Sequence, residues 1–64
     1  MPHVQITMLT GRSVEQKRRM VERVTDVLVE ELKVQPEAVV ITLLEVPSEN
    51  YARKGVLLSD RPGR

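Results

Sequence analysis

The strongest constraint on the fold is one amphipathic segment in the first half of the chain. Its apolar side chains recur at spacings of one, three and four residues, as on one face of a helix: Met20, Val21, Val24, Val27, Leu28 and Leu32. Ser13 precedes the segment and Gln16 follows three residues later, a capping-box pattern that marks a helix start. Pro36 cannot continue a helix and disfavours helical geometry in the residue before it. We therefore predict one helix from about Val14 to Leu32, ending near Lys33.

A run of strand character lies on each side of this helix. Residues 4–9 alternate apolar and polar side chains until Leu9 breaks the pattern, and they include β-branched residues, which predicts a strand. Residues 39–44 are continuously apolar apart from one threonine, which is typical of a strand covered on both faces. The order strand, helix, strand predicts a βαβ unit with parallel strands.

The C-terminal third carries a shorter pattern. Residues 47–50 indicate a loop, and residues 51–58 indicate a small hairpin that turns at Lys54 and Gly55. The polar residues 59–64 are expected to be a mobile tail. The predicted fold class is therefore α/β, a small βαβ subunit with a C-terminal hairpin, in a single domain that spans residues 1–64.

The chain is too short to build a sufficient core alone. It has 64 residues and no cysteine, so neither disulfides nor thiolate-bound metal can stabilise it. A domain of this size buries only about 60% of the surface of its unfolded chain. Two strands and one helix also leave one sheet face and both sheet edges uncovered. We therefore expect a homo-oligomer.

Charge and hydropathy argue against two classes of partner. Ten basic and nine acidic residues give a net charge of +1, and the single aromatic residue is Tyr51, so basic patches with aromatic stacking, typical of nucleic-acid binding, are not indicated. No apolar run reaches the ~20 residues of a membrane span, and no signal-peptide pattern is present. We expect a cytoplasmic protein without nucleic-acid or membrane partners.

The candidate for chemistry is Pro2. Removal of the initiator methionine would leave a secondary amine at the N-terminus, and α-amino groups can titrate near neutral pH. The sequence offers one histidine and no cysteine, so no catalytic triad and no metal site is expected. Arg12, just before the predicted helix, could favour an anion at the helix N-terminus. Taken alone, it is more simply an exposed arginine in a turn.

Together these features resemble the 4-oxalocrotonate tautomerase family of the tautomerase superfamily. The resemblance covers nearly the whole chain: Pro2 after the initiator methionine, the strand end and turn at residues 9–13, residues 15–17 opening the helix, the second strand closing on Glu45, and an aromatic residue at Tyr51. It implies a βαβ subunit whose strands are completed by dimer pairing, assembled as a hexamer that is a trimer of dimers.

The resemblance also implies an isomerase that needs no cofactor. Pro2 would be the general base for converting a 2-hydroxydienoate or enolpyruvate-type enol to a 2-oxo acid. Arg12, reaching in from a neighbouring subunit, would hold the substrate carboxylate. Tyr51 would occupy the position of the residue that forms the hydrophobic wall of the site in the family. Leu9 is also expected to bind the substrate. Apolar burial and nearby cations lower the pKa of an amine, which suits a base.

One expected residue is missing. The family tautomerase has a second arginine at the start of the second strand, where this chain has Val40, and residues 34–52 contain no basic residue at all. Arg53 is the nearest replacement, because its two-residue spacing from Tyr51 puts both side chains on one face of a strand. An equally simple interpretation is that Arg53 and Lys54 are solvated residues of an exposed hairpin.

The missing arginine bears on the substrate more than on the mechanism. Losing one charged hydrogen bond costs roughly 1.5 to 3 kcal/mol, or about one to two decades in efficiency. A dicarboxylate such as 2-hydroxymuconate would lose one of its anchors, whereas a monocarboxylate would lose less. We therefore expect weak activity on the diacid.

Two alternatives remain open at this point. The same fold could support hydratase or dehalogenase chemistry, which needs a carboxylate to activate water, and Glu49 and Glu45 are the candidates. The chain could also be a non-catalytic oligomeric protein in which Pro2 only starts a strand.

Overall fold

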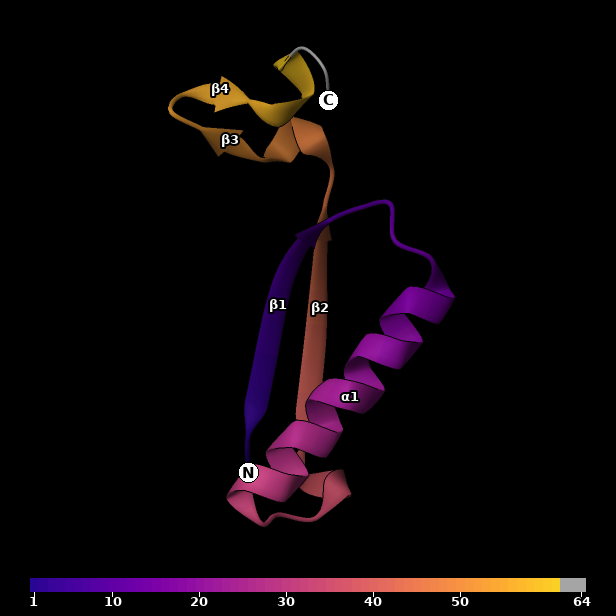
Figure 1. The fold of residues 1–64 in the computed structure, drawn as a ribbon. Helices are drawn as coiled ribbons and strands as arrows, with labels where there is room; N and C mark the ends of the chain where they lie inside the picture. The colour runs from indigo at the N-terminus through magenta and orange to yellow at the C-terminus, as the bar shows by residue number, and fades with distance from the viewer. Residues whose placement is uncertain (62–64) are drawn as a thin grey trace.

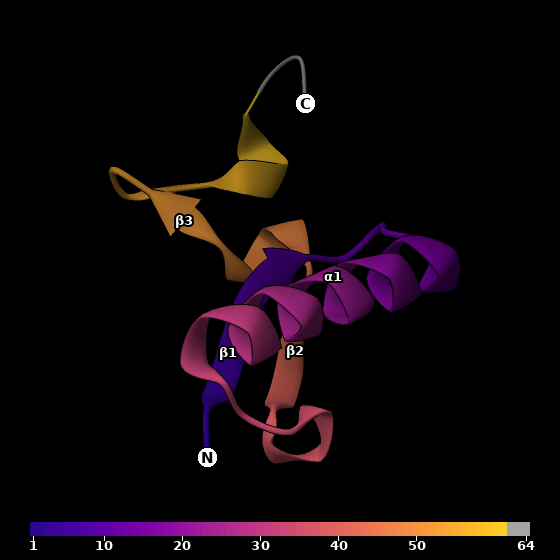
Figure 2. The same ribbon diagram turned by 60° about the horizontal axis from the view of Figure 1, so that its bottom comes forward.

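The computed structural model describes residues 1–61, and its first part is a strand–helix–strand unit. β1 (His3–Leu9), α1 (Val14–Leu32) and β2 (Val40–Val46) follow one another, with a short 3₁₀ turn, η1 (Pro36–Ala38), before β2. The two strands pair in parallel over their whole length. Figure 1 shows them side by side, and Figure 2 shows α1 lying across one face of the pair. The predicted α/β class and the parallel strands are confirmed.

Local hydrogen bonds fix both ends of α1. The Ser13 hydroxyl oxygen accepts from the Gln16 backbone N–H at 3.1 Å, and the Gln16 side-chain oxygen accepts from the Ser13 N–H at 3.0 Å. This is the predicted capping box. At the other end, Lys33 adopts a left-handed conformation with φ 56° and donates its N–H to the Val29 carbonyl. The helix therefore begins and ends where the sequence predicts.

Alternating exposure shows that α1 covers only one face of the strands. The even-numbered residues of β1 are half-buried, while the odd-numbered ones from His3 to Thr7 are exposed. In β2, Val40 and Leu44 are 39% and 46% exposed. Within the single chain, residues 39–44 are covered by α1 on one face only, as expected for two strands and one helix. Among residues 1–61, none is buried.

The apolar face of α1 is also only partly covered. Met20, Val21, Val24 and Leu28 are half-buried against the strands, but Val27 and Leu32 are 56% and 53% exposed. A sheet of only two strands is too narrow to cover the whole apolar face of the helix. The single chain thus presents apolar surface on the helix as well as on the sheet.

The C-terminal segment forms the predicted hairpin, which stands away from the two layers (Figure 1). After η2 (Ser48–Asn50) come β3 (Ala52–Arg53) and β4 (Val56–Leu57), paired antiparallel. The two residues between them, Lys54 and Gly55, have φ 55° and 77°, as a tight hairpin turn of the primed type requires.

Two details of this segment differ from the prediction. The loop predicted at residues 47–50 is a 3₁₀ turn over most of its length. Residues 59–61 also have a defined conformation: η3 (Leu58–Asp60) is followed by a half-buried Arg61. Residues 62–64, the rest of the predicted tail, lie outside the described residues. Hydrogen bonds from Leu58 and Arg61 to Tyr51 and Arg53 hold this turn against the hairpin.

The overall shape is flat and extended. The Cα radius of gyration is 15.2 Å and the principal extents are 44 × 24 × 14 Å, whereas a compact chain of this length has a radius of gyration of about 11 Å. No helix in the described part of the chain combines the length and apolar character needed to cross a membrane. A thin, open subunit of this kind gains a core only when further surface packs against it.

Candidate active site

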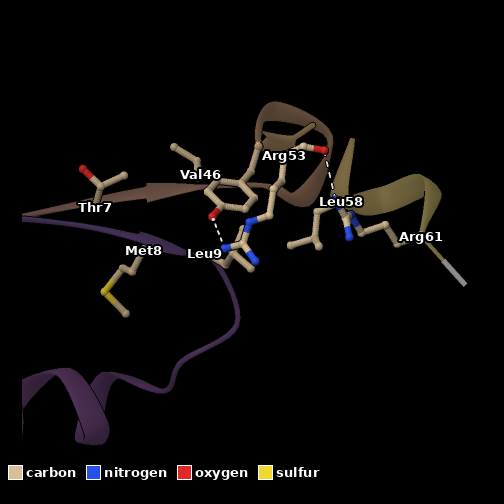
Figure 3. Close-up of a pocket in the computed structure, with 8 residues that line it drawn as sticks. Thr7, Met8, Leu9, Val46, Arg53, Leu58 and Arg61 are labelled. Carbon is tan, nitrogen blue, oxygen red and sulfur yellow. Dashed lines mark hydrogen bonds between the residues drawn. The ribbon is translucent and has the colours of Figure 1, made fainter. Parts of the chain in front are cut away.

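A cavity of about 330 Å³ lies between the carboxyl ends of the two strands and the C-terminal segment beyond them (Figure 3). Parallel strands present their carboxyl ends at the same edge, so β1 and β2 supply one wall and the hairpin region supplies the other. The lining residues are Thr7, Met8, Leu9, Val46, Tyr51, Arg53, Leu58 and Arg61. The volume is within the range of small-ligand pockets, and a mostly apolar lining with a few polar groups is typical of them.

Two arginines supply the charged groups of this cavity. Arg53 Nη2 donates to the Tyr51 hydroxyl oxygen at 3.1 Å. Arg61 Nη2 donates to the Arg53 backbone carbonyl at 2.9 Å. The Leu58 N–H donates to the Tyr51 carbonyl at 2.8 Å and ties η3 to the start of the hairpin. The predicted proximity of Tyr51 and Arg53 is confirmed by their contact.

The single chain assembles only part of the predicted site. Leu9, Tyr51 and Arg53 line the cavity together. Pro2 lies at the other end of β1, where its carbonyl accepts a hydrogen bond from the Val40 N–H at 3.1 Å. Pro2 and Leu9 are seven positions apart, about 23 Å at the rise of an extended strand. The candidate base and the cavity therefore cannot meet within one chain.

Arg12 lies at the same end of the subunit as the cavity, but it lines a neighbouring hollow. This hollow has a volume of about 230 Å³ and is lined by Met8, Arg12, Gln16, Lys17 and Met20. Met8 lines both spaces. Arg12 follows Gly11, whose φ of 124° turns the chain from β1 toward α1. Arg12 is exposed there.

Val40, at the position of the missing arginine, lies beside Pro2. It pairs with His3 in the sheet, and it donates its N–H to Pro2. The His3 ring Nε2 is 3.2 Å from the Thr42 hydroxyl oxygen on the exposed sheet face. Because Val40 is at the far end of the strands from Arg53, the two cannot serve the same position within one chain.

The two carboxylates considered for water activation lie outside the cavity lining. Glu45 Oε1 is bound by Lys17 Nζ at 3.0 Å, which ties β2 to α1. Glu49 is exposed in η2. Among residues 1–61, no group of three or more metal-ligating side chains is placed to hold an ion. The geometry thus gives Glu45 a structural role and offers no support for a hydratase.

Sequence reasoning missed Arg61 and Leu58. Both belong to the stretch expected to be a hairpin end and tail. Their spacing of three residues was the available signal, because side chains at positions i and i+3 align on a 3₁₀ turn. The turn itself could not be recognised in so short a polar segment.

Known proteins with similar sequences cover almost the whole chain. The model of the family described as tautomerase enzyme matches residues 2–61. A probable tautomerase of Halalkalibacterium halodurans is 41% identical over 95% of this chain and 100% of its own length. A 2-hydroxymuconate tautomerase of Bacillus subtilis is 42% identical over 94% of this chain and 97% of its own.

Solved structures agree with the sequence relatives. A 4-oxalocrotonate tautomerase homologue superposes with a TM-score of 0.91 at 38% identity, covering 98% of this chain and all of the other. A heterohexamer 4-oxalocrotonate tautomerase from Chloroflexus aurantiacus gives a TM-score of 0.86 at 28% identity, covering 94% of this chain and 97% of the other. With the fold, the family match and these relatives in agreement, this chain belongs to the tautomerase enzymes, in the 4-oxalocrotonate tautomerase family.

Proposed function

We propose that this tautomerase converts 2-hydroxydienoate or enolpyruvate-type enols to 2-oxo acids, with the amine of Pro2 as general base. The observation that carries the proposal is the position of Pro2 at one end of β1 and of the cavity at the other. A strand that holds half of a site at each end forms two complete sites when it pairs antiparallel with a second copy of itself. The name of the B. subtilis relative, 2-hydroxymuconate tautomerase, supports this type of substrate.

The free edge of β1 supports such pairing. The sheet has only two strands, so one edge of β1 has no partner within the described residues. Antiparallel pairing centred on Ile6 would place His3 of one copy opposite Leu9 of the other. Pro2 would then lie beside the other copy's cavity. The same pairing would produce a four-stranded sheet, and we propose a homo-oligomer built from such dimers, a hexamer as in the C. aurantiacus enzyme.

The proposed reaction is a proton transfer without a cofactor. The Pro2 amine accepts the proton of the substrate 2-hydroxyl group, and the electrons of that O–H bond form the carbonyl. The conjugated double bonds shift, and a carbon of the chain takes a proton back from the Pro2 ammonium. One O–H bond is broken and one C–H bond is formed, so oxidation state and charge are conserved. A free amine is required, because the nitrogen of an amide is not a base near neutral pH.

The remaining site residues bind the substrate and exclude water. The guanidinium of Arg12 binds the carboxylate next to the reacting enol. A planar guanidinium can donate two parallel hydrogen bonds to the two oxygens of a carboxylate. Leu9 and Tyr51 form apolar walls that keep the amine in a less polar environment. Arg53, hydrogen-bonded to Tyr51, provides a cation in the cavity itself.

The decisive experiment compares chains that begin at Met1 and at Pro2. Each sample is checked by intact mass and assayed by ultraviolet absorbance for loss of the enol of phenylenolpyruvate and of 2-hydroxymuconate. The chain that begins at Pro2 should be active, and the chain that retains Met1 should lose about two to four decades of rate, the usual contribution of a general base. Equal rates of the two samples, or of Pro2→Ala and the wild type, would refute the mechanism.

The binding roles have their own matched variants. Arg12→Ala should raise KM for both substrates, since both carry the carboxylate next to the enol. Arg53→Ala should damage activity more than Lys54→Ala, which removes the same charge from the neighbouring turn residue outside the cavity lining. Equal effects of the Arg53 and Lys54 variants would show that Arg53 is only a solvated hairpin residue.

A further inference from the structure

We propose that Arg61 is a specificity-determining residue that forms, with Arg53, a second carboxylate-binding subsite at the hairpin end of the cavity. The inference rests on the proposed function, because it concerns the same cavity. It adds a residue that the sequence comparison with the family did not indicate, and it places the subsite on the C-terminal segment rather than at the start of β2.

The contacts of Arg61 fix its side chain in the cavity wall. Figure 3 shows the side chain running from the C-terminal end of the segment toward Leu58 and the backbone of Arg53. Its Nη2 donates to the Arg53 carbonyl at 2.9 Å. Its Nε is shielded from solvent and has no hydrogen-bond acceptor among residues 1–61. A half-buried guanidinium held by one bond keeps further N–H donors for another acceptor, because the group carries five.

The charges in this part of the molecule are unbalanced. In the described part of the chain, the ion pairs are Lys17–Glu45 and Glu15–Arg18, so Arg53 and Arg61 have no carboxylate within ion-pair distance. Asp60 and Glu49, the acidic residues of the adjacent 3₁₀ turns, do not supply one. Two guanidinium groups in one small cavity repel each other unless an anion lies near both. The cavity is therefore suited to an anionic group.

The cavity lining defines what such an anion must be attached to. Apart from the arginines, the walls are mostly apolar, which suits a conjugated carbon chain. A carboxylate matches the guanidinium fork, and the proposed site already uses Arg12 for the carboxylate beside the enol. The Arg53–Arg61 subsite would therefore bind a second carboxylate at the far end of the substrate. This revises the expectation of weak activity on diacids, because the cation missing at Val40 is replaced from the C-terminal segment.

The test uses two unreactive ligands with the same carbon skeleton, muconate and sorbate, which differ in whether the far end is a carboxylate or a methyl group. Their affinities are measured by calorimetry for the wild type, Arg61→Gln and Arg61→Lys. Arg61→Gln should weaken muconate binding by about ten- to a hundredfold and change sorbate binding by less than about twofold. Arg61→Lys should retain part of the muconate affinity because it keeps the charge.

Three results would overturn the proposal. The first is unchanged muconate affinity in Arg61→Gln, and the second is an equal loss of muconate and sorbate affinity in that variant. The third is a loss of muconate affinity in Lys54→Gln equal to that in Arg61→Gln. Lys54→Gln removes the same charge from the same hairpin, outside the cavity lining. Repeating the measurement with Pro2→Ala as the parent separates this inference from the proposed function, because ligand binding needs no proton transfer. A Pro2→Ala variant with full turnover would refute the base, whereas the muconate and sorbate affinities would still report on Arg61.

Discussion

Replacing Leu44 by glutamate is expected to dissociate the oligomer. Leu44 lies in β2 on the face that α1 leaves uncovered, where it is 46% exposed in the single chain. The part of the side chain that remains in water is available for burial by another subunit. If subunits assemble over this face, a carboxylate at this position would be carried into the interface.

The size of the effect follows from the exposed fraction. Full burial of a leucine side chain is worth about 1.5–3 kcal/mol, so covering the exposed half contributes about 1 kcal/mol per copy. An unpaired carboxylate in the same place adds a desolvation penalty of several kcal/mol. Together these give a loss of at least ~3 kcal/mol per subunit, about a hundredfold in the association constant. Leu44→Ala loses only the first contribution, about fivefold.

Sedimentation equilibrium over a range of protein concentrations measures the assembly, and circular dichroism measures the melting temperature of the same samples. Because subunits that bind only when folded stabilise one another by mass action, the melting temperature of the wild type should rise with concentration. Leu44→Glu should sediment as smaller species and melt at a lower temperature. Val14→Glu is the matched control: Val14 is 63% exposed, and an acidic residue in the first turn of a helix is favourable.

The reasoning would be refuted by a Leu44→Glu protein with the same mass and melting temperature as Val14→Glu. That outcome would mean that the uncovered sheet face stays in water in the native protein. The subunit would then gain its stability elsewhere, and the exposed apolar residues of β2 would need another explanation.

Three further predictions concern local structure, each measured by urea unfolding at one protein concentration. In a double-mutant cycle, Lys17→Met and Glu45→Gln should show a coupling of about 0.5–1 kcal/mol, because their 3.0 Å ion pair is partly shielded; additive effects would mean that the pair contributes nothing. Ser13→Ala should lower the free energy of unfolding by about 1 kcal/mol by removing the helix cap, and an equal loss in Ser13→Thr would contradict this. Gly55→Ala should cost about 1–2 kcal/mol through its φ of 77° alone, since an added Cβ meets no atom within 4 Å; a neutral result would show that the turn relaxes.

The elements of the fold could be predicted because each is specified locally. The capping box of Ser13 and Gln16 is a contact between residues three apart, and Gly55 marks the hairpin turn because glycine adopts positive φ without strain. Each of these interactions involves residues only a few positions apart, so the sequence indicates them directly. The 3₁₀ turn η3 could not be predicted, because a single such turn has no local sequence signature and depends on contacts with the hairpin.

The candidate site could be predicted only in part. The sequence alone, through its resemblance to one family, indicated Pro2, Arg12 and Tyr51 as separate points along the chain. It also predicted that Tyr51 and Arg53 lie on one face, because side chains two residues apart point to the same side of a strand.

The sequence by itself therefore determined the order of the elements and the limits of the helix, and it gave the expectation of partner subunits. The tertiary structure decided which residues share a cavity: Leu9, Tyr51, Arg53 and Arg61 meet at one end of β1, and Pro2 lies at the other. Local patterns act through contacts a few residues apart, whereas the cavity depends on how the chain turns back after β2 and on the length of a rigid strand. That length keeps the proposed base and the cavity apart in one chain, and it is why a second copy is needed to bring them together.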